Sequence, residues 1–312
     1  MHRYISSTAV PIGIVKCLVL LLLSTLLIAT LLDLEPALAH VFLSDKNASL
    51  LATANQLKTE LELINYNLNH SDNNLALKHV ADATEIQNRG NNTSSFSIPY
   101  LDGIRQSIES IGVDSEKTDS LLRINKAIDN ASRFLDNKIV SEIDSRDLRN
   151  STIQALAIAN ITDEILREYA IAYGIVPVIA ATSGSMGNMM DMSSTMDSSI
   201  YSSPDSMAME DNRTPNASRI ANVSNYQNAQ GLASKALDLF RDDLKPLELL
   251  NATRSFLTAD VRSTSVSDLE DGLSLLISLI DDKKPYSDIM QVIHGPVHTS
   301  LFLAYDLKMI AE

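Results

Sequence analysis

Apolar side chains recur along this chain at alternating intervals of four and three residues, and this repeat limits the possible folds more than any other feature. The clearest repeat lies in residues 46–69, where the apolar positions are Leu50, Ala54, Leu57, Leu61, Ile64 and Leu68. This spacing places one apolar stripe along a helix, and the stripe has to be buried against other helices. Weaker stripes follow along most of the remaining chain. The sequence therefore predicts an all-α antiparallel bundle of about eight helices.

The composition agrees with helices and limits the possible partners. Aromatic residues make up 5% of the chain, Trp is absent, and Leu, Ile and Ala supply most of the apolar content, which favours helices over a β-sandwich or barrel. The formal net charge is −14. No nucleic-acid partner is expected, because binding to phosphates needs a basic surface.

We expect four parts along the chain. Residues 1–39 are an export segment, and residues 40–181 form a helical half-bundle. In residues 182–225 the periodicity vanishes and Ser, Asp, Asn and Met dominate, which indicates a flexible, disordered insertion. Residues 226–312 should form a second half-bundle that packs on the first.

Two helices carry local signals for where they begin and where they break. Asp144 or Ser145 should cap the longest helix, which would end before Gly174. The final helical segment should be kinked or restarted at Pro296, because proline lacks an N–H and its ring clashes with the carbonyl four residues earlier.

The first 39 residues have the pattern of an export signal. Arg3 and Lys16 precede sixteen uncharged residues, 17–32, and Ala37-Leu38-Ala39 supplies small residues at a cleavage site. The segment is either a cleaved signal peptide, which we favour, or a retained membrane anchor. In both cases the remaining chain would be extracytoplasmic, secreted or held at the outer face of the cytoplasmic membrane. The single Cys lies within this segment, so the mature chain has no thiolate metal ligand.

Acceptor sequences for N-glycosylation, Asn-x-Ser/Thr, support export. They begin at Asn47, Asn69, Asn91, Asn92, Asn130, Asn150, Asn160, Asn212, Asn216, Asn222 and Asn251. We expect a glycosylated surface protein, and an archaeal cell surface fits glycosylation without disulfides. The alternative is an Asn- and Ser-rich composition that is never modified.

Three histidines and one aspartate are candidate metal ligands. His294 and His298 are four residues apart and would meet on one helix face. His79 lies on an apolar stripe, with Asp82 three residues later. Imidazole and carboxylate suit copper, zinc or iron, and facing helices of a bundle can direct such ligands inward. The alternative is that the histidines are hydrogen-bonded core residues.

Methionines gather in the expected insertion. Seven of the ten Met residues lie there, namely Met186, Met189, Met190, Met192, Met196, Met207 and Met209. Thioethers prefer Cu(I), and the M-x-x-M and M-x-M spacings resemble the extracellular Met motifs of copper importers and periplasmic copper carriers. The alternative is a polar linker in which Met has no role.

Cleavage after Ala39 would make His40 the first residue of the mature chain. Its amine and imidazole could then chelate copper, and in this respect the start of the mature chain resembles periplasmic copper-resistance carriers. The alternative is that His40 simply follows the cleavage site.

The combination of an export signal, a helical body with H-x-x-D and a late His pair resembles exported helical proteins of ammonia-oxidising archaea. It is also distantly similar to imelysin-like and iron-permease-associated extracytoplasmic helical domains, which carry H-x-x-E. The matching residues here are His79 and Asp82, with Asp in place of Glu. The resemblance implies an extracytoplasmic helical domain with a role in iron binding.

These features together predict an extracytoplasmic protein that captures or delivers copper, or with less support iron or zinc. A membrane transporter or surface protein would then be its partner, and an uncleaved signal would add membrane contact at the N-terminus. The alternative is a surface interaction or sensory module without metal. No enzymatic motif is present, and carboxylates such as Glu60 should belong to a solvated face.

Overall fold

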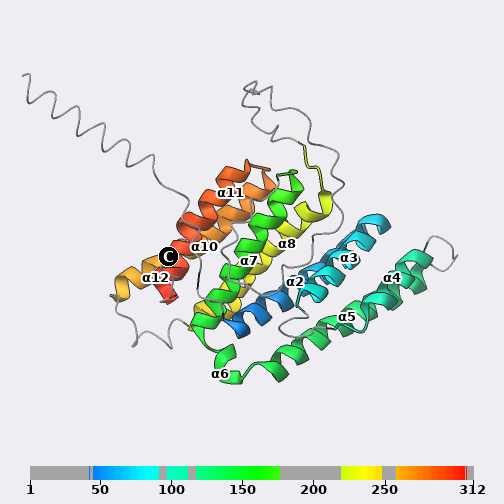
Figure 1. Ribbon diagram of the computed structural model, residues 1–312, viewed down its shortest axis with the longest axis horizontal. Helices are drawn as coiled ribbons and strands as arrows, with labels where there is room; N and C mark the ends of the chain where they lie inside the picture. Colours follow the sequence, from blue (N-terminus) through cyan, green and yellow to red (C-terminus); the bar gives the residue numbers. More distant parts are fainter. Residues whose placement is uncertain are drawn as a thin grey trace, which may run out of the picture. The chain divides into compact units, whose positions relative to one another are not determined.

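The computed structural model describes residue 42 and residues 45–90, 97–111, 117–175, 219–247, 258–305 and 307. Within these residues the chain is helical and contains no β-strand, so the predicted all-α antiparallel bundle is confirmed (Figure 1). None of the described helices combines the length and the apolarity needed to span a lipid bilayer. Residues 1–39 lie outside the described residues, as do residues 182–218 of the insertion that was expected over 182–225.

The first helical hairpin confirms the strongest sequence signal. Helix α2, Lys46–Asn69, has the predicted bounds, and its N-terminus is capped by the Asp45 side chain, which accepts hydrogen bonds from two backbone N–H groups. Its stripe residues, from Leu50 to Leu68, are all buried. A tight turn, with Ser71 at a φ of 62°, leads into α3, Asn73–Gly90.

A second pair of helices covers this hairpin. Helix α4, Leu101–Ser110, packs on α3, and α5, Lys117–Glu142, packs on α2 and α4. The inward positions of α5, such as Ile124 and Leu135, are buried, whereas Leu122 and Val140 are exposed on its other side.

The prediction that one long helix begins at Asp144 or Ser145 is wrong. Asp144 caps only the short α6, Ser145–Leu148, and α7 begins afresh at Ser151. The Asn150 side chain accepts a hydrogen bond from the backbone N–H of Thr152 and so caps the new helix. Helix α7, Ser151–Ala172, is buried along most of its circumference.

Helix α8, Val223–Leu239, lies beside α7 and continues into a π-helical turn, η1, Phe240–Leu244. Two backbone N–H groups just before α8, those of Ala221 and Asn222, donate to the carbonyl oxygen of Ala172 at 2.7 and 3.1 Å. The end of α7 and the start of α8 are therefore joined by main-chain hydrogen bonds.

The sequence predicted a kink or a restart at Pro296, and the chain does not restart there but stays helical through it. Helix α10, Ala259–Asp281, is followed by α11, Tyr286–Val292, which runs through the π-helical turn η2, Ile293–Val297, into α12, His298–Tyr305. Pro296 lies inside η2. The wider π-helical turn relieves the clash between the proline ring and the preceding turn, so the helix continues.

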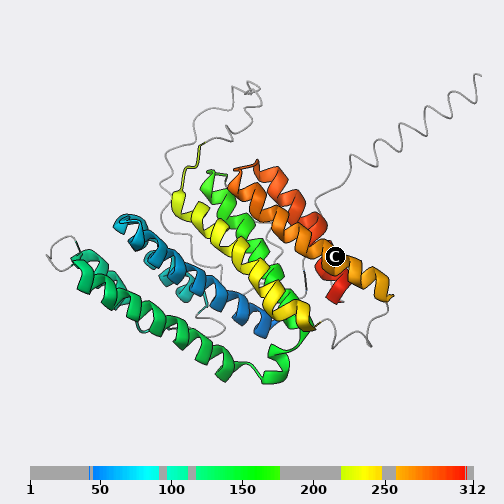
Figure 2. The ribbon, with the colours of Figure 1, turned by 180° about the vertical axis from the view of Figure 1, so that it is seen from behind.

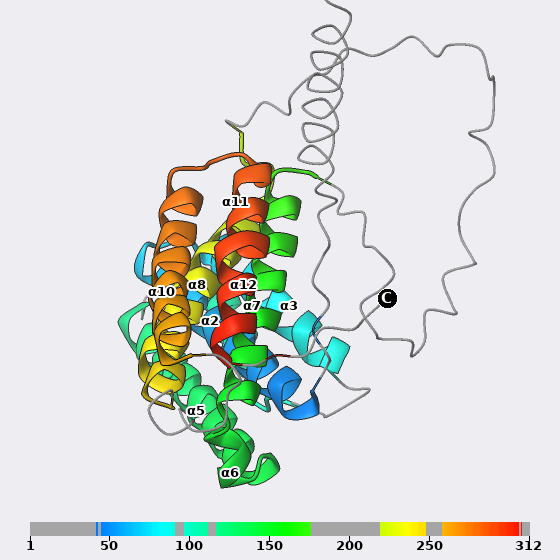
Figure 3. The same ribbon diagram turned by 90° about the vertical axis from the view of Figure 1, so that its left-hand side faces the viewer.

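Helices α7 and α8 are shared by two four-helix groups. On one side they pack against α2 and α3, and on the other against α10 and the α11–α12 segment, as Figures 2 and 3 show from two directions. The described residues from 42 to 307 belong to one compact unit. The group made of α2, α3, α7 and α8 contains the candidate site.

Candidate functional site

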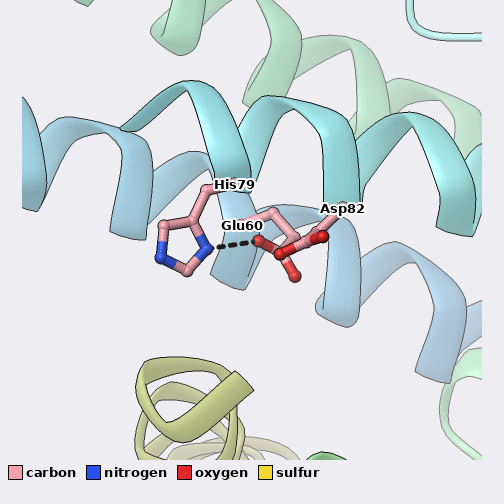
Figure 4. A group of neighbouring side chains, drawn as sticks. All are labelled: Glu60, His79 and Asp82. Carbon is pink, nitrogen blue, oxygen red and sulfur yellow. Dashed lines mark hydrogen bonds and ion pairs between the residues drawn. The ribbon is translucent and has the colours of Figure 1, made fainter. Parts of the chain in front are cut away.

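Three potential metal ligands meet between α2 and α3. Glu60 comes from α2, and His79 and Asp82 come from successive turns of α3 (Figure 4). One ligand atom of each lies within 4.8 Å of the others. A spacing of three residues places His79 and Asp82 on the same helix face, as the sequence predicted.

His79 is fully buried and uses both ring nitrogens. Its Nδ1 lies 2.8 Å from Oε2 of Glu60, and its Nε2 lies 2.9 Å from Oε1 of Gln227 on α8. A buried imidazole held from both sides has one orientation, which suits either a structural histidine or a metal ligand.

Glu60 and His79 perturb each other's protonation. Burial raises the pKa of the Glu60 carboxyl from its ordinary 4.5 to about 7, although the hydrogen bond and positive charge of His79 act in the opposite direction. Burial also opposes protonation of His79, but the hydrogen bond and charge of Glu60 outweigh it and raise the imidazole pKa. Glu60 and His79 therefore tend to keep a proton between them near neutral pH.

Asp82 is held by two further residues. The Ser224 hydroxyl donates to its Oδ2 at 2.5 Å, and Lys78 donates to its Oδ1 at 2.9 Å. A third acidic side chain, Glu168 on α7, is also buried and is bonded to Asn225 and Arg167. Burial raises the pKa of Glu168, and the negative charge of Asp82 is among the further causes.

Three residues at the start of α8 each form a hydrogen bond with one member of this cluster. Ser224 bonds Asp82, Asn225 bonds Glu168, and Gln227 bonds His79. Three carboxyl groups are thus gathered in a largely buried region. Lys78 and Arg167 each pair with one of them, so the repulsion between the carboxylates is offset only in part. A divalent cation bound there would offset that repulsion.

His294 and His298 lie at a different place. Their rings meet edge to face with centroids 5.3 Å apart, so the predicted i, i+4 pairing is preserved across the π-helical turn. His298 Nε2 lies 3.0 Å from the Thr162 hydroxyl and 3.6 Å from an Asp163 carboxylate oxygen on α7. Among the described residues, the group close enough to share one ion includes His79 and Asp82 but neither of these two histidines.

The remaining predicted ligands lie outside the described residues. They are His40, Met186, Met189, Met190, Met192, Met196, Met207 and Met209. A copper site built from them is neither supported nor contradicted by the described helices.

The prediction that Glu60 belongs to a solvated face is wrong, because only 3% of it is exposed. A signal for its burial was present in the sequence. Glu60 lies three residues after Leu57 and four before Ile64, so it borders the apolar stripe. Gln227 and Asn67 were missed because amides give no comparable signal of a metal site.

No protein-family model, curated protein or solved structure matches this chain. The resemblance to imelysin-like and iron-permease-associated domains therefore stays a prediction, and the function has to be argued from the site.

Proposed function

We propose that this protein binds a divalent transition-metal ion through Glu60, His79 and Asp82, and that it serves in extracytoplasmic capture or delivery of the metal. The observation that carries the proposal is the convergence of these three side chains within 4.8 Å in the interior of a four-helix group. The neighbouring Glu168 adds negative charge to the same region. Bundles commonly hold metals with carboxylates and imidazoles directed inward from facing helices.

The chemistry of these donors favours some metals over others. Two carboxylates and one imidazole suit iron or zinc better than Cu(I), which prefers sulfur ligands. Copper capture would depend instead on the Met cluster of the sequence. We therefore place iron or zinc at the described site, and keep copper as the metal that the Met cluster would bind.

The first test is metal retention by the purified protein after exposure to Fe²⁺, Zn²⁺, Cu²⁺ or Cu⁺ and desalting. Retention of about one equivalent of iron or zinc, lost in His79→Gln and in Asp82→Asn, is expected. His70→Gln is the matched control, because His70 is an exposed histidine of the same hairpin that bonds only locally, to the Tyr66 carbonyl. Loss of Cu⁺ alone on deleting residues 186–209 would assign copper to the Met cluster.

A second candidate function is a surface interaction or sensory module that binds no metal. It is favoured by the hydrogen bonds that already join Glu60 to His79 and Asp82 to Ser224 without an ion. A satisfied polar network of this kind can fix the packing of a core. If no metal is retained while His79→Gln still lowers the stability, the cluster is structural and the metal proposal fails.

A further inference from the structure

Given the proposed metal site, the hydrogen bonds around His79 decide which of its ring nitrogens faces the ion. We propose that Gln227 is a positioning residue, which keeps a hydrogen on His79 Nε2 and so presents Nδ1, beside Glu60, as the atom that coordinates a cation. A chain of hydrogen bonds runs from the main-chain carbonyl of Leu63 through Asn67 and Gln227 to the imidazole.

The first step fixes the orientation of the Asn67 side chain. Its Nδ2 lies 2.8 Å from the carbonyl oxygen of Leu63. A carbonyl oxygen can only accept a hydrogen bond, so the group facing it has to be the NH₂ end of the amide. Asn67 itself is buried, which leaves little room for another arrangement.

The second step fixes Gln227 through Asn67. The Asn67 Nδ2 also donates to Oε1 of Gln227 at 2.9 Å, and Nε2 of Gln227 donates back to Oδ1 of Asn67 at 3.2 Å. Turning the Gln227 amide over would place two NH₂ groups against each other and two oxygens against each other. Oε1 is therefore the end that faces His79.

The third step assigns the imidazole. His79 Nε2 lies 2.9 Å from that oxygen, and two acceptors cannot share a hydrogen bond without a hydrogen between them. Nε2 therefore carries the hydrogen. The other nitrogen, Nδ1, lies 2.8 Å from Glu60 and on the side of the ring where Asp82 lies (Figure 4).

A cation would then take the place of the proton between Nδ1 and Glu60. The Nε2–H···Oε1 hydrogen bond would remain, since the nitrogen of a metal-bound histidine that does not coordinate the metal generally keeps such a bond. It would hold the ring in the orientation that directs Nδ1 toward the ion. The start of α8 would thus act on the metal without touching it.

The test uses ¹⁵N-labelled histidine in the full chain and NMR of the ring nitrogens. In the metal-free protein near neutral pH, the His79 Nε2 should carry a hydrogen. In Gln227→Met, which has a similar size and no amide, Glu60 is the remaining partner and the Nδ1–H form should become populated. Gln227→Glu, which still offers an acceptor, should restore the hydrogen on Nε2. A wild-type His79 that carries its hydrogen on Nδ1 alone would overturn the inference.

The same samples titrated with ¹¹³Cd²⁺ separate this inference from the proposed function. Scalar coupling of cadmium to Nδ1 is expected, together with a loss of affinity of about 10- to 100-fold in Gln227→Met. Gln230→Met is the control, since Gln230 lies on the same helix but is bonded to Asp281 at the surface. Coupling to Nε2 would refute the inference and leave the metal site standing. Absence of cadmium binding would refute the proposed function, while the metal-free spectra would still decide the position of the hydrogen.

Discussion

Glu60 places an ionisable carboxyl group in the interior of a helical bundle, where it is hydrogen-bonded to His79. The pKa of Glu60 is raised to about 7 by burial, and the pKa of His79 is raised by Glu60. Both groups bind protons more tightly in the folded protein than in the unfolded chain. The folded state is therefore favoured at mildly acidic pH, and this contribution is lost as the pH rises through the raised pKa values.

We expect Glu60→Gln to flatten this pH dependence. In the metal-free wild-type protein, the free energy of unfolding should fall by on the order of 2 kcal/mol as the pH rises from about 4.5 to 7, with burial of Glu168 acting in the same direction. Urea denaturation at a series of pH values measures this difference. Glu62→Gln, at an exposed position of the same helix, is the control and should keep the wild-type profile. Equal pH profiles for wild type and Glu60→Gln would contradict the assigned burial of this charge.

Metal binding should have the opposite pH dependence, so that the stabilisation by the bound ion increases as the pH rises. A cation at Glu60, His79 and Asp82 competes with protons for the same atoms, so its affinity should increase with pH. A thermal shift measured with and without excess Zn²⁺ should therefore be larger at pH values above about 7 than at mildly acidic pH. A thermal shift that does not change with pH would mean that Zn²⁺ binds at a site other than Glu60, His79 and Asp82.

Part of the site could be predicted from single residues and part could not. The burial of His79 follows from its position on an apolar stripe, and the alignment of Asp82 follows from helical spacing. Glu60 was misassigned because its charge argued for solvent, and its partners come from α3 and, through Gln227, from α8. Contacts between helices that are far apart in the sequence are not encoded in the local pattern.

Between helices, the closest described approach at a glycine joins α2 and α8. A Cβ atom added at Gly231 would lie 2.6 Å from the Thr59 methyl carbon. Thr59 cannot turn away easily, because its hydroxyl donates to the Asn55 carbonyl and its χ1 angle is restricted. These two helices carry Glu60 and Gln227, so this contact also sets the distance across the site.

Gly231→Ala should therefore destabilise the protein by about 1–3 kcal/mol, because the overpacking outweighs the higher helix propensity of alanine. Thr59→Ser removes the obstructing methyl group and keeps the hydroxyl, so the double variant should recover most of the loss. Gly103→Ala, where an added Cβ meets no atom within 4 Å, is the matched control and should stabilise slightly. Chemical denaturation of the wild type, Gly231→Ala, Thr59→Ser and the double variant forms a double-mutant cycle, and a coupling energy near zero would exclude the close approach.

Helix boundaries followed from the sequence where caps and periodicity agreed, as at α2 with Asp45. They failed where two capping residues compete. Asp144 and Asn150 are six residues apart, and the periodic pattern continues through both, so the break between α6 and α7 was hidden. At Pro296, where a kink or a restart was predicted, the helix widens locally and does not restart.

At the scale of the whole unit, the helices differ in how many neighbours stabilise them. Helices α2, α7 and α8 pack on several others, whereas α4 and α5 lie to one side and pack chiefly on α2, α3 and each other. Elements with fewer buried contacts open at lower free energy than the rest of a domain.

Hydrogen exchange should therefore show lower protection in α4 and α5 than in α2, α7 and α8. Leu135→Ala, at a fully buried position of α5, should lower protection mainly in α4 and α5. Leu57→Ala, equally buried in α2, should lower the global free energy of unfolding by about 2–5 kcal/mol and reduce protection throughout. Uniform loss of protection in both variants would mean that the unit unfolds as one cooperative body.

The hydrogen bonds from Ala221 and Asn222 to the Ala172 carbonyl have a consequence for protein engineering. They bring the point where the chain leaves α7 next to the point where it returns to α8, so the helices meet whatever length of chain connects them. The junction between residues 175 and 219 is therefore a suitable site for inserting other segments. A short turn, or a guest domain whose own ends lie close together, inserted between residues 175 and 219 would start and end at points that these main-chain hydrogen bonds hold next to each other.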